Sequence, residues 1–317
     1  MYDVAALGEL LIDFTCLSTD ADGYPTMAAH PGGAPANYLA ALTKFGAKTA
    51  MIGKVGNDAF GRLLIKTLKG TGIDTRGMLV SDDVFTTLAF VTLDDSGNRE
   101  FSFARKPGAD TQLRFDEIDL GVIDASKVLH FGTLSMTNEP ARDATYKAVE
   151  YAAGHGKLIS FDPNLRKPLW DDLDEAKRQM LWGLRHADIV KISDEETEFL
   201  FGIAPEEGAK HIIDSFGVRL VYVTCGAEGC FYRTKTASGF VKALSGIAVK
   251  DTTGAGDIFG GSAMYGLLRA GGVPEKLTAE ELENIVSFAC ASAGLSTTKA
   301  GGISSVPELI EVEAAMK

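Results

Sequence analysis

The stretch "LISFDPNLRKPLWDDLDEAKRQMLWGLRHADIVKIS", residues 158–193, contains the unit that decides the fold. Two apolar runs at 158–164 and 188–193 have the length of buried strands, and residues 172–185 between them have the period of a helix. Strands joined through a helix run parallel, because a tight turn connects only antiparallel strands. The stretch therefore predicts a strand–helix–strand unit within a parallel sheet.

The same alternation continues along most of the chain. Further strands are predicted at 4–11, 49–55, 128–134 and 219–225, and further helices at 34–45, 58–69, 140–153 and 194–201. The run "RLVYVTC" at 219–225 is nearly continuous in hydrophobic residues, which is typical of a strand buried on both faces. We predict an α/β fold in which helices cover a mostly parallel central sheet.

Residues 86–105 interrupt this alternation. They fit two strands joined by an Asp-Ser-Gly-Asn turn at 95–98, which is a hairpin pattern. Together with residues about 14–28, the hairpin would form a small sheet that projects from the main domain, and an ordinary surface meander is the alternative. No linker or repeat divides the chain, so we predict a single domain over residues 1–317.

The composition limits the classes of partner and compartment. The 317 residues carry a net charge of −12, whereas a nucleic-acid-binding surface needs a basic face. The four cysteines show no C-x-x-C spacing, and the N-terminus lacks the basic region of a signal peptide. No uncharged apolar stretch reaches about 18 residues. We therefore expect a cytoplasmic protein without a membrane span and without a nucleic-acid partner.

The stretch "DTTGAGDIFGGSAMYGLLRA", residues 251–270, places Asp257 between a glycine turn and an uncharged helix. Backbone N–H groups at a helix N-terminus form an anion site, and the small residues at 254–256 let an oxyanion approach it closely. A carboxylate beside such a site can accept the proton of an attacking hydroxyl during phosphoryl transfer. On its own, however, the same Asp is better explained as a helix cap, and only the rest of the chain favours catalysis.

Two other phosphate motifs do not fit. Gly254-x-Gly256 followed by Gly260 resembles a damaged dinucleotide fingerprint, but it lies late in the chain, and Asp257 would face the pyrophosphate. The Walker A pattern of the P-loop enzymes is absent.

Two signatures resemble those of the ribokinase-like, or pfkB, carbohydrate kinases. The segment "DTTGAGDIFGGSA" (251–263) is similar to the family's C-terminal signature, with Ser262 as a small departure. The segment "GGAPANYLAALTKFGAKTAMIGKVGNDAFG" (32–61) is similar to the N-terminal one, and the resemblance covers nearly the whole chain. It implies a ribokinase-like three-layer sandwich with a small β-sheet lid over a sugar site.

The resemblance implies roles for residues at the sugar and at the transferred phosphate. Asp257 would be the catalytic base, with the backbone amides of Gly254, Ala255 and Gly256 as the anion hole. The positions that match sugar-binding residues of the family are Asp13, Gly32, Gly33 and Asn37. An Asp only accepts hydrogen bonds whereas an Asn also donates them, so together they can recognise neighbouring hydroxyls.

The resemblance also implies ATP and cation sites. The nucleotide positions are Thr224, Gly226, Gly229 and Cys290. Glu196 matches the acid that orders the Mg²⁺ shell, through water here, although Ser193 stands where the family usually has Asn. The positions that match a monovalent cation site, for K⁺, are Asp251, Thr253, Ser296 and Gly301.

Four segments of the sequence bear on the identity of the substrate. The segments 8–14, 104–110, 159–170 and 191–196 are more similar to bacterial fructokinases than to ribokinases, and in that subgroup Arg166 and the lid residue Arg105 would approach the sugar. We expect transfer from ATP to the primary hydroxyl of a free sugar, giving fructose 6-phosphate from fructose.

Several alternatives stay open. The pairs Arg105-Lys106 and Arg166-Lys167 would also suit an anionic substrate such as 2-keto-3-deoxygluconate, or they are simply solvated basic surface. The other candidates are ribose, a nucleoside such as aminoimidazole riboside, and a sensor without catalysis on the same fold. The predicted lid presents a sheet edge through which a homodimer can form.

Overall fold

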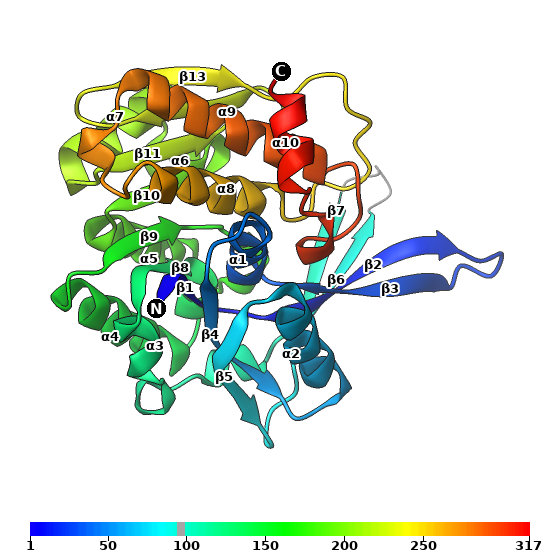
Figure 1. Cartoon of the computed structure of the whole chain (residues 1–317). Coiled ribbons are helices and arrows are strands. Elements are labelled where there is room, and N and C mark those ends of the chain that lie inside the picture. The colour runs from blue at the N-terminus through cyan, green and yellow to red at the C-terminus, as the bar shows by residue number, and fades with distance from the viewer. Residues whose placement is uncertain (94–98) are drawn as a thin grey trace.

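The computed structural model describes residues 1–93 and 99–317, and their centre is a sheet of nine strands (Figure 1). In sheet order these are β13 (Ser238–Lys242), β12 (Gly229–Arg233), β11 (Leu220–Thr224), β10 (Ile189–Ser193), β9 (Leu158–Asp162), β8 (Ser126–Gly132), β1 (Tyr2–Leu7), β4 (Thr49–Gly56) and β5 (Asp74–Ser81). The strands from β11 to β5 are parallel, while β12 pairs antiparallel with both β11 and β13. The predicted mostly parallel sheet is confirmed.

Helices cover both faces of this sheet (Figure 1). One face carries α1 (Ala34–Lys44), α2 (Ala59–Thr71), α8 (Ala255–Arg269), α9 (Ala279–Ser296) and α10 (Leu309–Ala315). The other carries α3 (Leu120–Asp124), α4 (Ala141–Gly154), α5 (Leu173–His186), α6 (Asp194–Phe201) and α7 (Pro205–Phe216). The three-layer arrangement is as expected.

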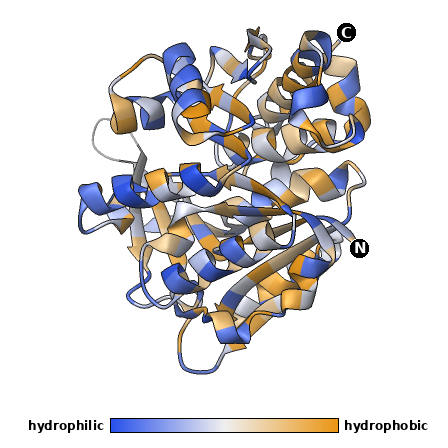
Figure 2. Cartoon of the chain, turned by 90° about the vertical axis from the view of Figure 1, so that its left-hand side faces the viewer, coloured by the Kyte–Doolittle hydropathy of each residue, from blue (hydrophilic) through white to orange (hydrophobic). Residues whose placement is uncertain are grey.

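The alternation of side chains along each strand explains the two hydrophobic cores. In β1, Val4 and Ala6 belong to the core beneath α1 and α8, whereas Ala5 and Leu7 belong to the core on the opposite face. Hydrophobic colouring accordingly gathers on the central strands, and hydrophilic colouring on the outer helix surfaces (Figure 2). No helix in the described part of the chain combines the length and the hydrophobicity needed to cross a membrane.

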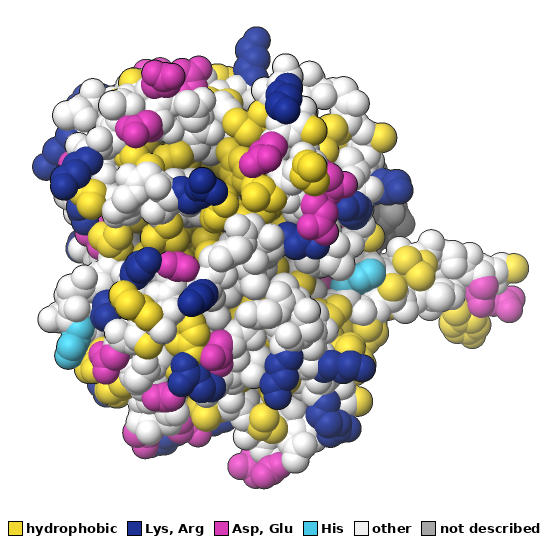
Figure 3. Space-filling model, viewed as in Figure 1, with side chains coloured by type: hydrophobic (Ala, Val, Ile, Leu, Met, Phe, Trp, Pro, Cys, Tyr) yellow, Lys and Arg dark blue, Asp and Glu magenta, His cyan; other side chains and the backbone are white. Residues whose placement is uncertain are grey.

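A second, smaller sheet has four strands in the order β3 (Pro25–Gly32), β2 (Leu11–Thr19), β6 (Leu88–Leu93) and β7 (Arg99–Ala104). We call this sheet the lid. Its strands include most of the segments that the sequence predicted, at 14–28 and 86–105. The β2–β3 hairpin projects away from the body of the molecule (Figures 1 and 3). The turn predicted at 95–98 lies outside the described residues.

The strand predicted at 4–11 is wrong in one respect, because the structure divides it between the two sheets. β1 ends at Leu7, and β2 begins at Leu11 in the lid. The chain bends at Gly8, where a Cβ would lie 2.7 Å from Cγ of Pro35. The apolar run is continuous in sequence because both strands have buried ends at this junction.

Candidate active site

The predicted base, Asp257, lies at the start of α8, near the carboxyl ends of β9 and β10, where ligands bind in open α/β sheets. It is only 6% exposed. Its Oδ2 accepts a hydrogen bond from Nδ2 of Asn37 (2.9 Å), and its Oδ1 accepts one from Nδ2 of Asn164 (3.2 Å). Burial raises the pKa of Asp257, which Lys191 and the Asn37 hydrogen bond partly counteract. The geometry is that of an oriented carboxylate with proton affinity above the ordinary value.

The turn before Asp257 presents fewer amides than expected. Gly254 is the N-cap of α8 with φ +76°, and a Cβ there would lie 2.9 Å from Cα of Gly302. The N–H of Ala255 donates to the carbonyl of Thr252 (3.2 Å), so its predicted place in the anion hole is corrected to a bond within the turn. Within residues 1–93 and 99–317, the N–H groups of Gly254 and Gly256 have no hydrogen-bond partner. These two amides remain for an anion.

Three side chains around Asp257 were missed by the sequence analysis. Asp162, at the end of β9, accepts hydrogen bonds from Nζ of Lys191 (3.0 Å) and from the backbone N–H of Asn164 (3.1 Å). Asn164 has φ +46°, a left-handed conformation that Asn tolerates better than most residues. The sequence could have indicated these three residues because they lie toward the ends of two predicted strands. The carboxyl ends of parallel strands share one edge of the sheet.

The sugar-side loop is shaped by two glycines. A Cβ at Gly32 would lie 2.1 Å from Oδ2 of Asp13, and a Cβ at Gly33 would lie 2.5 Å from the carbonyl oxygen of Glu9. Glu9 itself is buried, and its Oε1 accepts a hydrogen bond from the N–H of Ala34 (2.8 Å) at the start of α1. Glu9 is a further residue that the sequence analysis missed. The glycines therefore let backbone and carboxylates approach one another closely.

Asp13 extends from the lid toward the same place. Burial raises its pKa to about 7; the nearby charge of Arg166 acts against this shift, and those of Asp257 and Asp251 add to it. The structure thus brings Asp13, Arg166 and Asp257 within electrostatic reach of one another, and Asn37 joins them through its bond to Asp257. Four of the predicted sugar and base residues share one site.

We predict that Gly33→Ala destabilises the protein more than Gly46→Ala does. Both glycines have positive φ, +117° and +99°, but nothing lies within 4 Å of a Cβ at Gly46. Gly46→Ala should therefore cost only the conformational strain, about 1 kcal/mol, whereas Gly33→Ala adds a backbone clash and should cost about 2–3 kcal/mol more. Urea denaturation measures both free energies of unfolding, and equal losses would contradict the close approach.

The predicted nucleotide residues gather around the turn between β11 and β12. Thr224 ends β11, Gly226 lies in the turn that follows with φ +51°, and Gly229 begins β12 with φ +136°. A Cβ at Gly229 would lie 2.0 Å from the carbonyl oxygen of Val241. Cys290 is buried on α9, which packs against β12 and β13. Three of these positions thus adjoin the β11–β12 turn of the central sheet, and the fourth lies on the helix that packs against β12.

Glu196 has a structural role that sequence reasoning did not foresee. Its Oε2 accepts the N–H of Ser193 (2.8 Å), and the Ser193 hydroxyl accepts the N–H of Glu196 (3.1 Å), which is a capping box for α6. Its Oε1 accepts the N–H of Leu165 (2.6 Å) and so fixes the loop after β9. Ser193 is therefore explained as the helix cap.

The described residues contain no group of three or more His, Cys, Asp or Glu side chains arranged to hold a metal ion. A carboxylate has additional lone pairs beyond the bonds seen here, so Glu196 fits an indirect role through water.

The predicted monovalent-cation positions lie where two loops meet. Oδ1 of Asp251 accepts hydrogen bonds from the N–H (2.9 Å) and hydroxyl (2.7 Å) of Thr253, and its Oδ2 accepts the N–H of Gly301 (2.9 Å). Ser296 is buried on α9, and its hydroxyl donates to the carbonyl of Ala293 (2.7 Å). The structure brings Asp251, Thr253 and Gly301 together, with the Ser296 side chain turned to its own helix.

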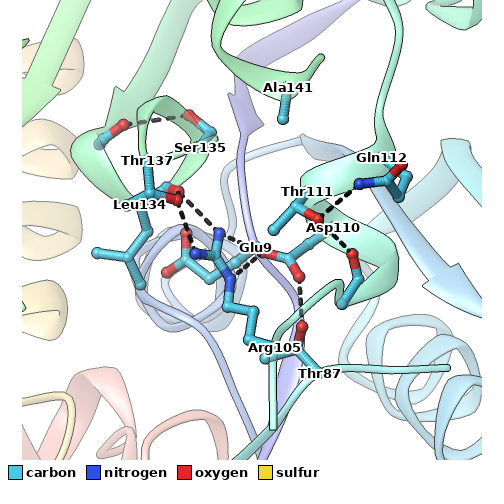
Figure 4. Close-up of polar contacts among 12 residues, drawn as sticks. Glu9, Thr87, Arg105, Asp110, Thr111, Gln112, Leu134, Ser135, Thr137 and Ala141 are labelled. Atoms are coloured by element: carbon cyan, nitrogen blue, oxygen red, sulfur yellow. Dashed lines mark hydrogen bonds and ion pairs between the residues drawn. The ribbon is translucent and has the colours of Figure 1, made fainter. Parts of the chain in front are cut away.

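The predicted substrate-binding role of Arg105 is corrected by its contacts (Figure 4). Its guanidinium is buried and donates twice to Oδ2 of Asp110 (2.8 and 2.7 Å), once to the hydroxyl of Thr137 (2.7 Å) and once to the carbonyl of Leu134 (2.8 Å). Four of its five N–H donors are therefore engaged inside the protein. We therefore remove Arg105 from the substrate-binding residues. Its role is to form a buried ion pair with Asp110.

Comparison with known proteins decides the family. The family model described as pfkB family carbohydrate kinase matches residues 1–309. The chain belongs to the pfkB family of carbohydrate kinases. The resemblance inferred from residues 32–61 and 251–263 is thereby confirmed, and so is the class of activity, transfer of a phosphoryl group to a sugar hydroxyl.

This pfkB kinase is similar to fructokinases in sequence and structure. It is 40% identical over 318 residues to "Probable fructokinase-4" of Arabidopsis thaliana, with 99% of this chain and 96% of that protein covered. The ATP-bound fructokinase of Xylella fastidiosa has a TM-score of 0.91 and 29% identity, covering 100% of this chain and 98% of that one. The fructokinase of Vibrio cholerae, solved with fructose, ADP and calcium, has a TM-score of 0.87 and 31% identity, covering 100% and 99%.

Proposed function

We propose that this pfkB kinase transfers the γ-phosphoryl group of ATP to the primary hydroxyl of fructose, giving fructose 6-phosphate. The observation that carries the proposal is the Asp257 carboxylate, held by Asn37 and Asn164 beside the two amides of the α8 turn that have no partner in the described part of the chain. The choice of fructose over ribose, 2-keto-3-deoxygluconate or a nucleoside is supported by relatives about 40% identical, which are fructokinases.

The reaction follows from these positions. Asp257 accepts the proton of the attacking hydroxyl, and the N–H groups of Gly254 and Gly256 stabilise charge that develops on the phosphoryl oxygens. Sugar hydroxyls would be bound by Asp13, Asn37 and Arg166, with Gly32 and Gly33 giving the backbone close access. Lid closure over the sugar would exclude water and limit ATP hydrolysis.

The nucleotide and its ions complete the proposal. ATP would lie along the β11–β12 turn, at Thr224, Gly226 and Gly229, with its base beside Cys290. Mg²⁺ neutralises phosphate charge when it is bound, and Glu196 would hold one of its waters. K⁺ would be held by the loops of Asp251, Thr253 and Gly301. An assay with each ion omitted in turn tests both assignments.

The lid also suggests how two copies would associate. Leu17 and Tyr24 are exposed on the projecting β2–β3 hairpin, and apolar groups on an exposed sheet edge favour pairing with another sheet. We include a homodimer through the lid in the proposal. Sedimentation of the wild-type protein tests it, and a monomer at every concentration would contradict it.

A substrate panel with coupled detection of ADP tests the proposed function. The panel contains fructose, ribose, 2-keto-3-deoxygluconate, aminoimidazole riboside and fructose phosphates. We expect the highest kcat/KM for fructose. A higher value for another member would reassign the substrate, while binding without turnover of any member would support the sensor alternative.

The raised pKa of Asp257 predicts how activity depends on pH. A carboxyl whose pKa is raised by burial becomes protonated at a higher pH than usual, and a protonated Asp257 cannot accept the hydroxyl proton. We therefore expect log kcat to fall as pH decreases, with an apparent pKa above the ordinary aspartate value of about 3.9. A kcat profile that stays flat down to the ordinary carboxyl range would contradict this assignment.

A further inference from the structure

Lys191 is a largely covered cation beside the phosphate turn, and the proposed reaction leaves it without a role. It lies on β10, and its Nζ would be 3.0 Å from a Cβ built on Gly256. Gly256 is therefore the residue whose missing side chain leaves room for the ammonium at the start of α8. The Lys191 side chain keeps 12% of its surface exposed, so it is not sealed from a ligand.

The hydrogen bonds of Lys191 leave donors for a ligand. An ammonium has three N–H donors, and within the described residues Lys191 uses one of them, toward Oδ2 of Asp162 (3.0 Å). Asp162 also accepts the N–H of Asn164, which in turn donates to Asp257. One carboxylate thus orients both the lysine and the residue that holds the base.

The carboxylates around the turn favour a cation there. Asp162, Glu196 and Asp257 all act on Lys191 electrostatically and, although burial lowers its pKa, they raise it overall. Lys191 is therefore charged at neutral pH. A triphosphate that approached these carboxylates without a cation between them would be repelled. The acids fix the ammonium at the place where phosphate charge would develop.

We propose that Lys191 is a phosphate-binding catalytic residue, which donates its remaining N–H groups to an oxygen of the transferred phosphoryl group. This role rests on the proposed kinase function. As the sugar oxygen forms its bond to the γ-phosphorus, the bond from that phosphorus to the bridging oxygen breaks and ADP leaves. The hydroxyl proton goes to Asp257, and Lys191 keeps its own protons throughout.

The test compares binding of ADP with that of AMP-PNP, both with Mg²⁺, in the full-length protein by calorimetry. Because only AMP-PNP has the γ-phosphoryl group, Lys191→Met should weaken AMP-PNP binding about 10-fold to 100-fold more than ADP binding. We also expect kcat for fructose to fall at least about 10²-fold. Lys191→Arg should recover part of the AMP-PNP preference, since it restores the charge.

Lys54→Met is the matched control. The side chain of Lys54 is 10% exposed, close to the 12% of Lys191, and its Nζ is paired with Glu117 (2.7 Å). If Lys191 only stabilised Asp162, Lys191→Met would lower stability as Lys54→Met does and leave the ratio of ADP to AMP-PNP affinity unchanged. That result would overturn the proposal.

A second variant covers a failure of Lys191→Met to fold. Lys191→Gln keeps most of the side-chain volume and one hydrogen bond to Asp162. The ratio of ADP to AMP-PNP affinity is measured for this variant too. We expect the same loss of AMP-PNP preference, and an unchanged ratio would again overturn the proposal. Binding needs no turnover, so the ratio is measurable even if no sugar is phosphorylated. Loss of the proposed function and loss of the Lys191 role are therefore separate results.

Discussion

Replacement of Asp257 by Asn should lower kcat by at least about 10²-fold while KM for fructose and ATP stays within severalfold. The amide cannot accept the hydroxyl proton, but it has the volume of the carboxylate. Asn37 and Asn164 each donate to one oxygen of Asp257, so one of them would face the new amide nitrogen. The Oδ1 of Asn37 is buried and has no hydrogen-bond partner among the described residues, and a rotated Asn37 amide would present it to that nitrogen. We therefore expect the variant to fold.

Steady-state kinetics with fructose measure this effect, and Asp214→Asn is the control. Asp214 is an exposed carboxylate on α7, paired with Lys210, and its replacement should leave kcat unchanged. Near-normal turnover by Asp257→Asn would exclude the residue as the base. A parallel loss of kcat and of fructose affinity would instead indicate that Asp257 mainly holds the substrate.

The fold could be predicted closely because its signals are local. Strands and helices alternate with clear hydrophobic periods, and elements such as α1, α5 and β10 lie within a residue or two of their predicted bounds. The strand at 4–11 was wrong because hydrophobicity does not record which sheet a residue enters. The bend between the two strands is at Gly8, which lies close to Pro35, a residue distant in sequence.

The site could be predicted only in part, for a related reason. Asp257 and its turn are contiguous, so one stretch of sequence contains both. The Lys191–Asp162 and Arg105–Asp110 pairs depend on which side chains meet in space. The sequence does not distinguish a basic residue that faces a ligand from one that is paired with an internal carboxylate. The occupied amide of Ala255 likewise depends on turn geometry that composition does not reveal.

Arg105 gives the second large expected effect, and it is on stability rather than on substrate binding. Arg105 and Asp110 are both 2% exposed at their side chains and joined at 2.7 Å. Among the described residues, Arg105→Met would leave the buried Asp110 carboxylate with only its bond from the Thr87 hydroxyl. Removal of one partner of a buried ion pair costs about 3–5 kcal/mol, because the remaining charge is uncompensated. We expect a loss of this size in the free energy of unfolding.

Urea denaturation of three variants separates this account from a substrate contact. The double variant with Arg105→Met and Asp110→Asn removes both charges, so it should regain at least half of the stability that Arg105→Met loses. Arg166→Met, at a residue that remains within the proposed sugar site, should instead raise KM for fructose and change stability little. If Arg105→Met were stable and raised KM in the same way, its guanidinium would have to leave Asp110 when sugar binds. The buried pair would then be a resting arrangement of the lid, and Arg105 would return to the substrate-binding set.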